Sequence, residues 1–418
     1  MELKPGYKQT EVGVVPGEWE VQTVRNVSDM VTVGFVGSMA HLFTENGVPL
    51  LRGQNVLPGR IDLTDSKFIS QQTHNLWKKS ALRGGDIVIV RVGYPGTSAV
   101  VPKDFGAANA ASLVVVRPNS SCVDSDFMCW VLLSDIGRRQ VKAALVGGAQ
   151  QVINIGTAAS LLLPVPAKNE QRAIAGALSD VDALLGAQDR LIAKKRVLKQ
   201  AAMQQLLTGQ TRLPGFHGEW EVKRLGDLAK IQRGASPRPI DSPVWFDDNS
   251  LIGWVRISDV TRSGMFLIET TQRLSPLGVE HSRPVATGSL IMSICATVGR
   301  PIITHIDVCI HDGFVVFDNL QTDQRFLYYV LKWIEPDWSK HGQTGSQMNL
   351  NTGLINGTRI SLPPLAEQTA IAEVLTEMDA ELVGLEQRRE KTRALKQAMM
   401  QELLTGRTRL VRPQEATT

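Results

Sequence analysis

Cysteine and histidine are scarce in this 418-residue sequence, and their spacing argues against cross-links and metal sites. The four cysteines include no CxxC pair, and the seven histidines show no zinc-type spacing. We expect Cys122, Cys129, Cys295 and Cys309 to be free thiols in a reducing compartment. The sequence thus predicts neither a metal ion nor a cofactor in this chain.

Long apolar runs are also missing. No run approaches the roughly 18 residues that a membrane-spanning helix needs. The N-terminal residues lack the basic-then-apolar pattern of a secretory signal. Together these absences predict a cytoplasmic protein without a membrane partner. The formal net charge is only +4, so any attraction to nucleic acid has to come from a local basic patch.

Motifs for catalysis are equally hard to find. The chain contains no Gly-Lys dipeptide, so residues 85–88 and 93–96 are expected to be strand ends with glycine turns rather than a phosphate-binding loop. Its one Pro-Pro pair, residues 363–364, precedes a helix, so the chain lacks the Asn-Pro-Pro-aromatic segment that amino-methyltransferases use. We find no nuclease carboxylate–lysine cluster and no nucleophile–base pair. We therefore interpret the chain as a binding protein without chemistry of its own.

The most informative feature that is present is a long internal repeat. Residues 171–213 align without a gap with residues 368–410, and roughly half of the aligned positions are identical. Gly-Glu-Trp-Glu-Val occurs at residues 17–21 and again at 218–222. The repeat therefore indicates two similar halves, each made of a variable block followed by a near-constant helix.

Residues 170–208 and 367–405 are predicted to form these helices. Both segments lack proline and are rich in good helix formers. Gly209 and Gly406 follow the predicted last turns, where a residue with positive φ commonly ends a helix. Apolar residues recur at steps of three and four, which predicts a coiled-coil seam. The seam residues are Ile174, Leu178, Val181, Leu185, Leu198, Leu206, Ile371, Leu375, Met378, Leu382, Leu395 and Leu403.

The charge order along the two segments favours one direction of pairing. Each begins with acidic residues and ends with basic ones. Antiparallel pairing sets every acidic half against a basic half, whereas parallel pairing sets like against like. The alternative explanation is that this order suits the dipole of each helix by itself. Antiparallel pairing within one chain would place the two blocks at opposite ends of the helices.

The two blocks alternate short apolar runs with Gly, Pro, Asn and Asp, as expected of α/β domains with many exposed loops. Residues 127–144 are predicted to be helical. The second block has ten arginines against four lysines between residues 214 and 366, a ratio that fits planar, bidentate recognition.

Several loops carry side chains suited to base edges. Arg, Gln and Asn in residues 52–55 are the types that bind G and A in the major groove. The alternative for any one of these residues is an ordinary surface side chain or polar turn. The candidate DNA-contacting residues are Arg52, Gln54, Asn55, Arg91, Gln150, Gln151, Asn154, Arg256, Ser258, Arg300, Gln347, Asn349 and Asn351.

Taken together, these residues resemble the DNA-specificity subunit of type I restriction–modification enzymes. The resemblance rests on Tyr-Lys-Gln-Thr-Glu-Val-Gly at residues 7–13, Arg-Gly-Gln-Asn at 52–55, Pro-Pro-Leu-Ala-Glu-Gln at 363–368 and the two helix endings at 198–209 and 395–406. It extends over essentially the whole chain. Block interiors vary widely in this family, so few residue roles can be transferred. The first helix begins differently, after Pro-Val-Pro-Ala-Lys-Asn-Glu-Gln at residues 164–171.

The resemblance implies an α/β protein with two α/β target-recognition domains separated by two long antiparallel coiled-coil helices, with internal pseudo-two-fold symmetry. The implied domains are a first target-recognition domain (1–163), a central conserved helical region (164–213), a second target-recognition domain (214–360) and a distal conserved helical region (361–418). It also implies double-stranded DNA, two methyltransferase subunits and two restriction subunits as partners. S-adenosylmethionine, ATP and Mg would belong to those partners.

Three other functions stay open from the sequence. The chain could be the specificity subunit of a methylation-only or combined-activity (type IIB-like) system. It could be a stand-alone enzyme with an unrecognised site, or a coiled-coil scaffold without a DNA role. Modification or cleavage of DNA by the chain alone would favour the enzyme, and failure to protect any duplex would favour the scaffold.

Overall fold

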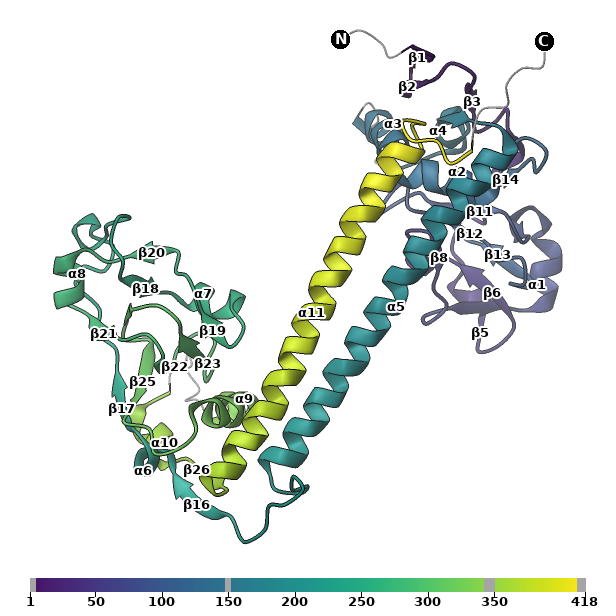
Figure 1. The fold of residues 1–418 in the computed structure, drawn as a ribbon. Helices are drawn as coiled ribbons and strands as arrows, with labels where there is room; N and C mark the ends of the chain where they lie inside the picture. Colours follow the sequence, from purple (N-terminus) through teal and green to yellow (C-terminus); the bar gives the residue numbers. More distant parts are fainter. Residues whose placement is uncertain (1–4, 147–151, 342–349, 412–418) are drawn as a thin grey trace. The chain divides into compact units, whose positions relative to one another are not determined.

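The computed structural model describes residues 5–146, 152–341 and 350–411 of the chain. Its contacts group the chain into two units: unit 1 comprises Met1–Asp189 and Gln387–Thr418, and unit 2 comprises Arg190–Glu386. Unit 1 holds the first variable block (block 1) and unit 2 holds the second (block 2), as Figure 1 shows. Each unit also contains half of each long helix.

Block 1 is built on two sheets. One is an antiparallel sheet in the order β12-β11-β14-β4, and the other has the order β10-β13-β6-β9-β5 with β13 and β6 parallel. Their strands are β4 (Ser28–Val33), β5 (Phe43–Thr44), β6 (Val48–Leu51), β9 (Lys67–Ile69), β10 (Ala81–Leu82), β11 (Ile87–Val90), β12 (Ser98–Val100), β13 (Ala108–Ala110) and β14 (Leu113–Pro118). β11 is buried on both faces, which explains its uninterrupted Ile-Val-Ile-Val sequence.

The remaining elements of block 1 frame these sheets. Two hairpins, β1–β2 and β7–β8, and the pair β3–β15 complete its strands. Their bounds, with those of the short helices, are β1 (Tyr7–Thr10), β2 (Gly13–Pro16), β3 (Glu20–Thr23), β7 (Val56–Leu57), β8 (Arg60–Ile61), β15 (Leu162–Val165), α1 (Gln71–Leu76), α2 (Ser125–Leu133), α3 (Asp135–Val146) and α4 (Ile155–Ser160).

Block 2 repeats this plan. Its sheets have the orders β17-β25-β22-β23-β19 and β20-β18-β24-β21, and the second again contains one parallel pair, β18 with β24. The strands are β16 (Glu221–Arg224), β17 (Lys230–Arg233), β18 (Gly253–Val255), β19 (Phe266–Leu267), β20 (Gln272–Arg273), β21 (Arg283–Val285), β22 (Leu290–Ser293), β23 (Pro301–Thr304), β24 (Val308–Ile310), β25 (Phe314–Asp318) and β26 (Arg359–Leu362). The helices are α6 (Leu225–Leu228), α7 (Ile257–Arg262), α8 (Pro276–Glu280), α9 (Gln324–His341) and α10 (Thr352–Gly357).

The prediction that residues 127–144 are helical is confirmed by α2 and α3, which a break at Ser134 separates. At the break, the Ser134 hydroxyl bonds the carbonyl of Val131 at 2.6 Å and accepts the amide of Ile136 at 3.2 Å. These local bonds compete with the helical ladder and start a new helix.

The two long helices are α5 (Lys168–Leu207) and α11 (Leu365–Leu403), coloured teal and yellow in Figure 1. Both begin two residues earlier than predicted. Gly209 and Gly406 follow them with φ of 71° and 67°, which confirms the predicted helix ends. The proposed domain boundaries at 163/164 and 360/361 fall inside β15 and β26, a few residues before these helices.

In both units the two helices pack antiparallel, as predicted. In unit 1 the first half of α5 meets the last half of α11 through Asp182–Lys396 and Asp189–Arg389. In unit 2 the pairing is the reverse: the basic half of α5 meets the acidic half of α11. Its ion pairs are Lys195–Glu381, Arg196–Glu386 and Lys199–Asp379.

The helix seam is partly as predicted. Of the twelve predicted seam residues, seven are buried: Ile174, Leu178, Leu206, Ile371, Leu375, Leu382 and Leu403. Val181, Leu185 and Met378 are half-buried. The seam prediction is wrong for Leu198 and Leu395, since 46% and 54% of their surfaces are exposed. On α5, the buried side chains on either side of Leu198 are instead Ile192 and Met203.

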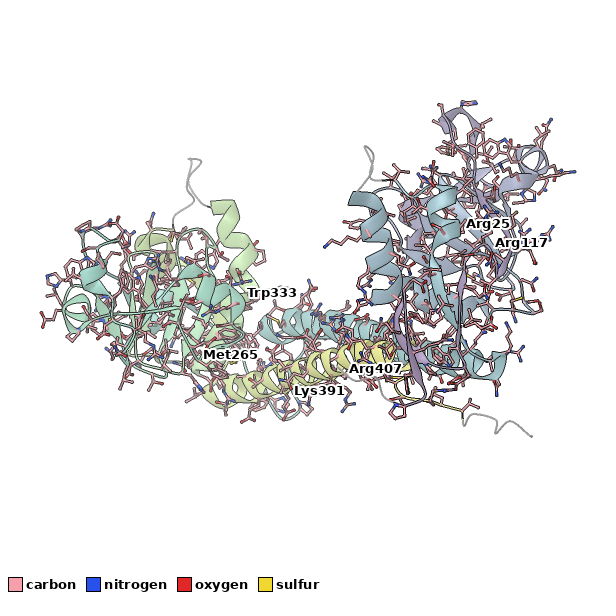
Figure 2. The ribbon with its side chains drawn as sticks, turned by 90° about the horizontal axis from the view of Figure 1, so that it is seen from above. Arg25, Arg117, Met265, Trp333, Lys391 and Arg407 are labelled. Carbon is pink, nitrogen blue, oxygen red and sulfur yellow. The ribbon has the colours of Figure 1, made fainter. Side chains whose placement is uncertain are left out.

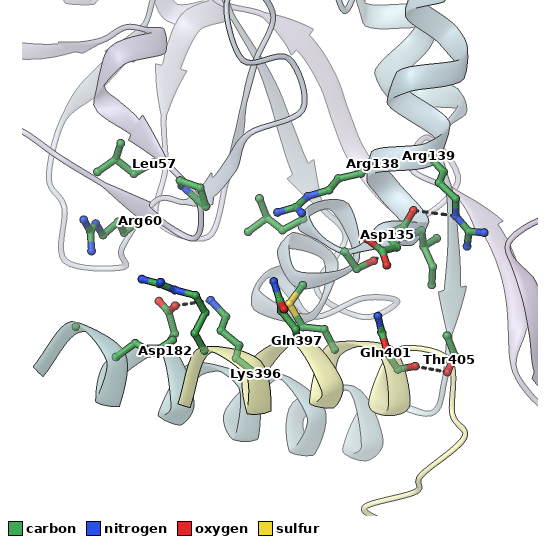
Figure 3. A pocket seen from close by; sticks show the side chains of 18 of the residues that line it. Leu57, Arg60, Asp135, Arg138, Arg139, Asp182, Lys396, Gln397, Gln401 and Thr405 are labelled. Atoms are coloured by element: carbon green, nitrogen blue, oxygen red, sulfur yellow. Dashed lines mark hydrogen bonds and ion pairs between the residues drawn. The ribbon is translucent and has the colours of Figure 1, made fainter. Parts of the chain in front are cut away.

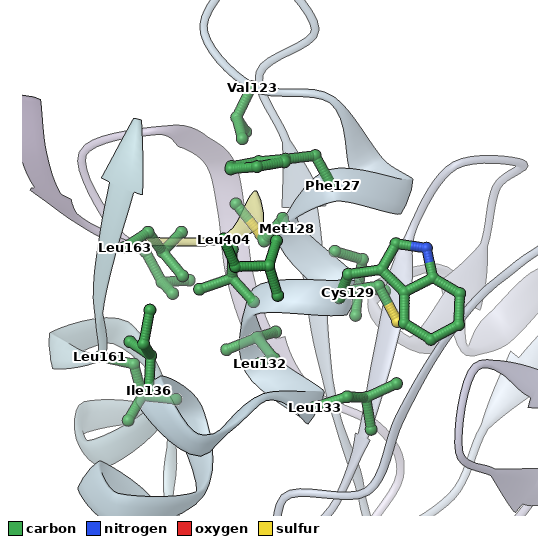
Figure 4. Close-up of a cluster of buried hydrophobic side chains, with 14 of the residues drawn as sticks. Val123, Phe127, Met128, Cys129, Leu132, Leu133, Ile136, Leu161, Leu163 and Leu404 are labelled. Atoms are coloured by element: carbon green, nitrogen blue, oxygen red, sulfur yellow. The ribbon is translucent and has the colours of Figure 1, made fainter. Parts of the chain in front are cut away.

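Each block completes its core with the end of the other repeat's helix. In unit 1, Leu403 at the end of α11 joins the block 1 core. Leu404, the residue after α11, lies there with Phe127 and Met128 of α2 (Figure 4). In unit 2, Leu206 and Leu207 of α5 join the block 2 core, against which Met265 and Trp333 also pack (Figure 2). Each core therefore requires chain segments from both repeats. Within the described residues, no helix has the length and apolar content to cross a membrane.

Candidate nucleic-acid interface

Arg52 is presented by a capped turn at the end of β6. Its backbone amide donates to Oδ1 of Asn55 at 3.1 Å, which closes the turn. Its guanidinium donates through one terminal nitrogen to the carbonyl of Asp65 at 3.0 Å and lies 3.9 Å from the Asp65 carboxylate. Gln54 bonds the same carboxylate. The loop around residues 62–65 therefore holds Arg52 and Gln54 side by side at the surface.

Asn55 does not belong to this surface, so its prediction as a DNA contact is wrong. Only 1% of it is exposed. Its amide nitrogen donates to the carbonyls of Asp62 and Asp65 at 3.0 and 3.3 Å, while its oxygen caps the turn. Both the oxygen and the amide nitrogen of Asn55 are therefore bonded inside the loop, where no base edge can reach them.

Arg256 occupies the equivalent place in block 2, directly after β18. Its backbone amide donates to Oδ2 of Asp259 at 2.9 Å, in the same spacing as Arg52 and Asn55. Asp259 is completely buried and also accepts from the hydroxyl of Thr271 at 2.6 Å. The guanidinium Nε of Arg256 donates to Oε1 of Gln272 at 2.6 Å. Ser258, which lies between Arg256 and Asp259 in the chain, is exposed, as a surface contact would require.

The remaining described candidates have mixed positions. Arg91 donates from Nε to the carbonyl of Ile153 at 2.9 Å and so anchors the chain before α4. Asn154 and Asn351 are exposed helix caps: their side-chain oxygens accept from Thr157 and Leu354, at the starts of α4 and α10. Their contact with DNA stays a prediction.

Arg300, the last described candidate, is tied to α9. Its Nε donates to the carboxylate of Glu335 at 3.2 Å, and Lys332 pairs with the same carboxylate. The other four candidates, Gln150, Gln151, Gln347 and Asn349, lie outside the described residues.

A basic groove of about 910 Å³ lies in unit 1 beside the Arg52 segment. The β7–β8 hairpin, the start of α3 and the facing sides of α5 and α11 line it (Figure 3). Lys396 pairs with Asp182 there and lies 4.5 Å from the ring centre of Trp130. Its basic residues are Arg60, Arg138, Arg139, Arg393, Lys396 and Arg407, and its acidic residues are Asp135, Asp182 and Asp189. Cations therefore outnumber acids on this surface.

Sequence reasoning missed the residues that orient these arginines. Asp65 and Gln272 come from other segments and reach Arg52 and Arg256 only in the fold. It also missed the buried Asp86, which receives two bonds of 2.7 and 2.8 Å from Arg117 (Figure 2) and raises the pKa of that guanidinium. Asp86 follows a repeated glycine, Gly85, whose φ of 89° marks the turn before β11. The repeat of this glycine was the sequence signal that could have drawn attention to Asp86.

Two of the four thiols are buried in the structure, and one histidine is partly buried. Burial raises the pKa of Cys309 to about 11 and raises that of Cys129 further, so neither thiol ionises near neutral pH. Burial lowers the pKa of His311, which packs against Trp254 and Phe314. In the described ranges, no three His, Cys, Asp or Glu side chains are arranged to hold a metal ion.

Comparison with known proteins matches this repeated architecture. The family model of the type I restriction modification DNA specificity domain matches residues 16–194 and again residues 217–394. A putative type I restriction enzyme specificity subunit, MjaX, of Methanocaldococcus jannaschii is 24% identical over 423 residues, covering 97% of both chains. The EcoBI specificity subunit of Escherichia coli is 23% identical over 175 residues, covering 42% of this chain and 36% of its own.

Solved structures share the fold over nearly the whole chain. The S subunit of a type I restriction–modification system from M. genitalium superimposes with a TM-score of 0.61 at 15% identity, covering 96% of this chain and 98% of its own. A chain from a study of assembly and conformational transition of the type I R-M system gives 0.59 at 18% identity, covering 94% and 99%.

The two matches of the family model together cover most of the chain. This protein therefore belongs to the family of type I restriction–modification DNA specificity proteins, and it carries two DNA specificity domains in tandem.

Proposed function

We propose that this chain is the DNA-specificity subunit of a type I restriction–modification complex, in which each block reads one half of a split double-stranded target. The observation that carries the proposal is the repeated presentation of an arginine. Arg52 and Arg256 each follow a strand of the same topological type, and each has its backbone amide capped by a side chain three residues later. The same scaffold thus presents the same base-reading group twice, in different surroundings.

The proposal makes this chain a non-catalytic subunit. Methylation of adenine and cleavage would be carried out by two methyltransferase and two restriction subunits, which would hold S-adenosylmethionine, ATP and Mg. The charged flanks of α5 and α11, which include the ion pairs Lys195–Glu381 and Asp182–Lys396, are the surfaces we expect the methyltransferase subunits to dock on. We expect the complex to work in the cytoplasm.

A block exchange tests this function. The chain is co-expressed with its methyltransferase subunits, and methylated adenines are mapped in DNA from the host cell. Replacing block 1 with that of another family member should change one half of the methylated sequence and leave the other intact. A change in both halves, or no methylation by an assembled complex, would contradict independent reading by two blocks.

A change of helix length tests the role of the paired helices. Inserting about four residues, roughly one helical turn, at the same point of both repeats should alter the number of unread base pairs between the half-sites. Both half-sites should remain as in the wild type. Altered half-sites with an unchanged spacer would contradict the idea that α5 and α11 set the spacing.

A further inference from the structure

The contrast between Arg52 and Arg256 points to a residue that neither the sequence nor the family assigns. Both arginines have capped backbones, but their side chains are held differently. Arg52 is held through a terminal nitrogen by the loop at Asp65, and its Nε is buried without a partner among the described residues. Arg256 is held through Nε by Gln272. Within the described part of block 2, the terminal nitrogens of Arg256 therefore make no hydrogen bond, whereas Arg52 has one terminal nitrogen already engaged.

Gln272 is itself rigidly placed. It lies on β20, which pairs with β18. In the register of this pair Gln272 lies opposite Trp254, and Trp254 is two residues before Arg256 in the chain. Its backbone carbonyl accepts from the Thr270 hydroxyl at 2.8 Å. The preceding Thr271 is held by the buried Asp259, the same side chain that caps Arg256. One buried carboxylate thus holds Arg256 and the residue that precedes Gln272.

The hydrogen bond between the two side chains determines what they can recognise. A glutamine normally reads adenine with its oxygen and nitrogen together, and this requires both atoms. Here Oε1 already accepts from Nε of Arg256, which leaves it one lone pair, and the amide nitrogen remains a donor. The two terminal nitrogens of arginine are also donors. The groups that the pair can offer are therefore mostly donors, and guanine, with N7 and O6, is the base that presents two acceptors in the major groove.

We infer that Gln272 is a specificity-determining positioning residue of block 2, which holds Arg256 through Nε so that the pair selects guanine at one base pair of its half-site. This inference rests on the function proposed above. In block 1 the carboxylate of Asp65 beside Arg52 is an acceptor, and 72% of its side chain is exposed. The homologous arginine there stands next to an acceptor, so the two blocks differ in hydrogen-bond character at equivalent places.

Two substitutions of similar size separate positioning from simple packing. Gln272→Met removes both hydrogen-bonding atoms and releases Nε of Arg256. Gln272→Glu keeps an acceptor for Nε but replaces the outward donor with an acceptor. Gln232→Met is the matched control, because Gln232 accepts from Arg283 at 2.5 Å in a second arginine–glutamine pair of block 2 that lacks the capped turn.

The measurement is the base preference at each position of a randomised target, methylated by the complex of the full chain with its methyltransferase subunits. Gln272→Met should reduce the preference for guanine at one base pair by about 10- to 100-fold. Arg256→Lys should act at the same base pair, and the double variant should lose little more than either single variant. Gln272→Glu should lower guanine preference there as well, and Gln232→Met should leave it unchanged.

Three outcomes would overturn the inference. They are an unchanged guanine preference in both Gln272 variants, an equal loss at every position, and the same change in Gln232→Met. An equal loss would indicate a phosphate contact. If Gln272→Met fails to fold, Gln272→Glu decides alone. A wild-type complex without any split target would instead contradict the proposed function, so the two failures are distinguishable.

Discussion

The side chains that join each block to the two long helices are chemically alike in the two units, whereas the surfaces of the two blocks differ. In unit 1, Arg409 binds the carboxylate of Glu170 and lies 5.7 Å from the ring of Trp19. In unit 2, Arg212 binds Glu367 and lies 5.6 Å from the ring of Trp220. Both carboxylates are almost completely buried. The same three side-chain types therefore join each block to the two helices.

Further contacts are repeated with the same chemistry. Gln171 and Gln368 each accept a backbone amide at 2.8 Å, from Asp124 and Asp323, and each donates to a proline carbonyl at 2.8 Å. The contacts between a block and the helices can have the same residue types in both units, because both partners of each contact are duplicated together. The recognition surfaces have no such internal partner, which leaves Asp65 and Gln272 free to differ.

The largest expected effect concerns the shared cores. Leu404 is completely buried in the block 1 core and Leu207 nearly so in the block 2 core. Leu404→Ala should destabilise unit 1 by about 2–5 kcal/mol, through lost burial and a cavity. Hydrogen exchange should show faster opening of unit 1 amides with unit 2 little changed, and Leu207→Ala should give the reverse pattern. Equal loosening of both units by either variant would contradict separate cores.

The next effect concerns the buried joints. Arg409→Ala leaves the Glu170 carboxylate buried without its ion pair, so we expect a loss of about 2–4 kcal/mol in unit 1. Restoring neutrality with Glu170→Gln in the same chain should recover part of that loss. Chemical unfolding followed by hydrogen exchange measures both. Arg212→Ala should act in the same direction on unit 2, and a loss confined to unit 1 in both variants would show that the joints are not equivalent.

A smaller effect is expected in the middle of the helices, where the repeats differ. Gln188 of α5 is buried and donates to Thr392 of α11 at 3.2 Å, but its oxygen has no partner among the described residues. The same repeat position holds Leu385 in α11. Gln188→Leu should be neutral or stabilising by up to about 1 kcal/mol, since Thr392 keeps its bond to the Arg388 carbonyl. The matched Leu385→Gln should destabilise by about 1 kcal/mol. Thermal melting measures both, and destabilisation by Gln188→Leu would contradict the reasoning.

The smallest effect is a pH dependence confined to unit 2. Burial lowers the pKa of His311, so the neutral ring favours the folded state. Its stabilising contribution is complete above the unfolded pKa of about 6.5 and is lost as pH falls toward the lower folded pKa. Between about pH 7.5 and 5.5, unit 2 amides should therefore gain exchange relative to unit 1. His311→Gln should flatten this dependence, and an identical pH response in the variant would assign it to other groups.

The two long helices and their pairing could be predicted from the sequence because most of the signals for them are local. The repeat, the glycines after each helix and the order of acidic and basic residues depend on neighbours within a few turns, and each was confirmed in α5 and α11. The seam failed at Leu198 and Leu395 because the buried face of a helix depends on what packs against it. The break at Ser134 within residues 127–144 was not predicted, because it depends on one serine side chain that competes with the backbone.

The surroundings of the candidate DNA-contacting residues were less predictable for the same physical reason. Residue type alone indicated Arg52, Asn55 and Arg256, yet Asn55 is buried in its own loop. Asp65 and Gln272 carried no signal, since their importance comes from strands and loops that meet only in the folded block.

The sequence by itself determined the duplication, the two long helices, their ends and their antiparallel direction, because periodicity and charge act along a single segment. Only the tertiary structure decided which helix end completes which core, which polar side chains are used up inside loops, and what stands beside each arginine. Those outcomes depend on contacts between segments far apart in the chain, and burial and hydrogen-bond partners are properties of such contacts alone.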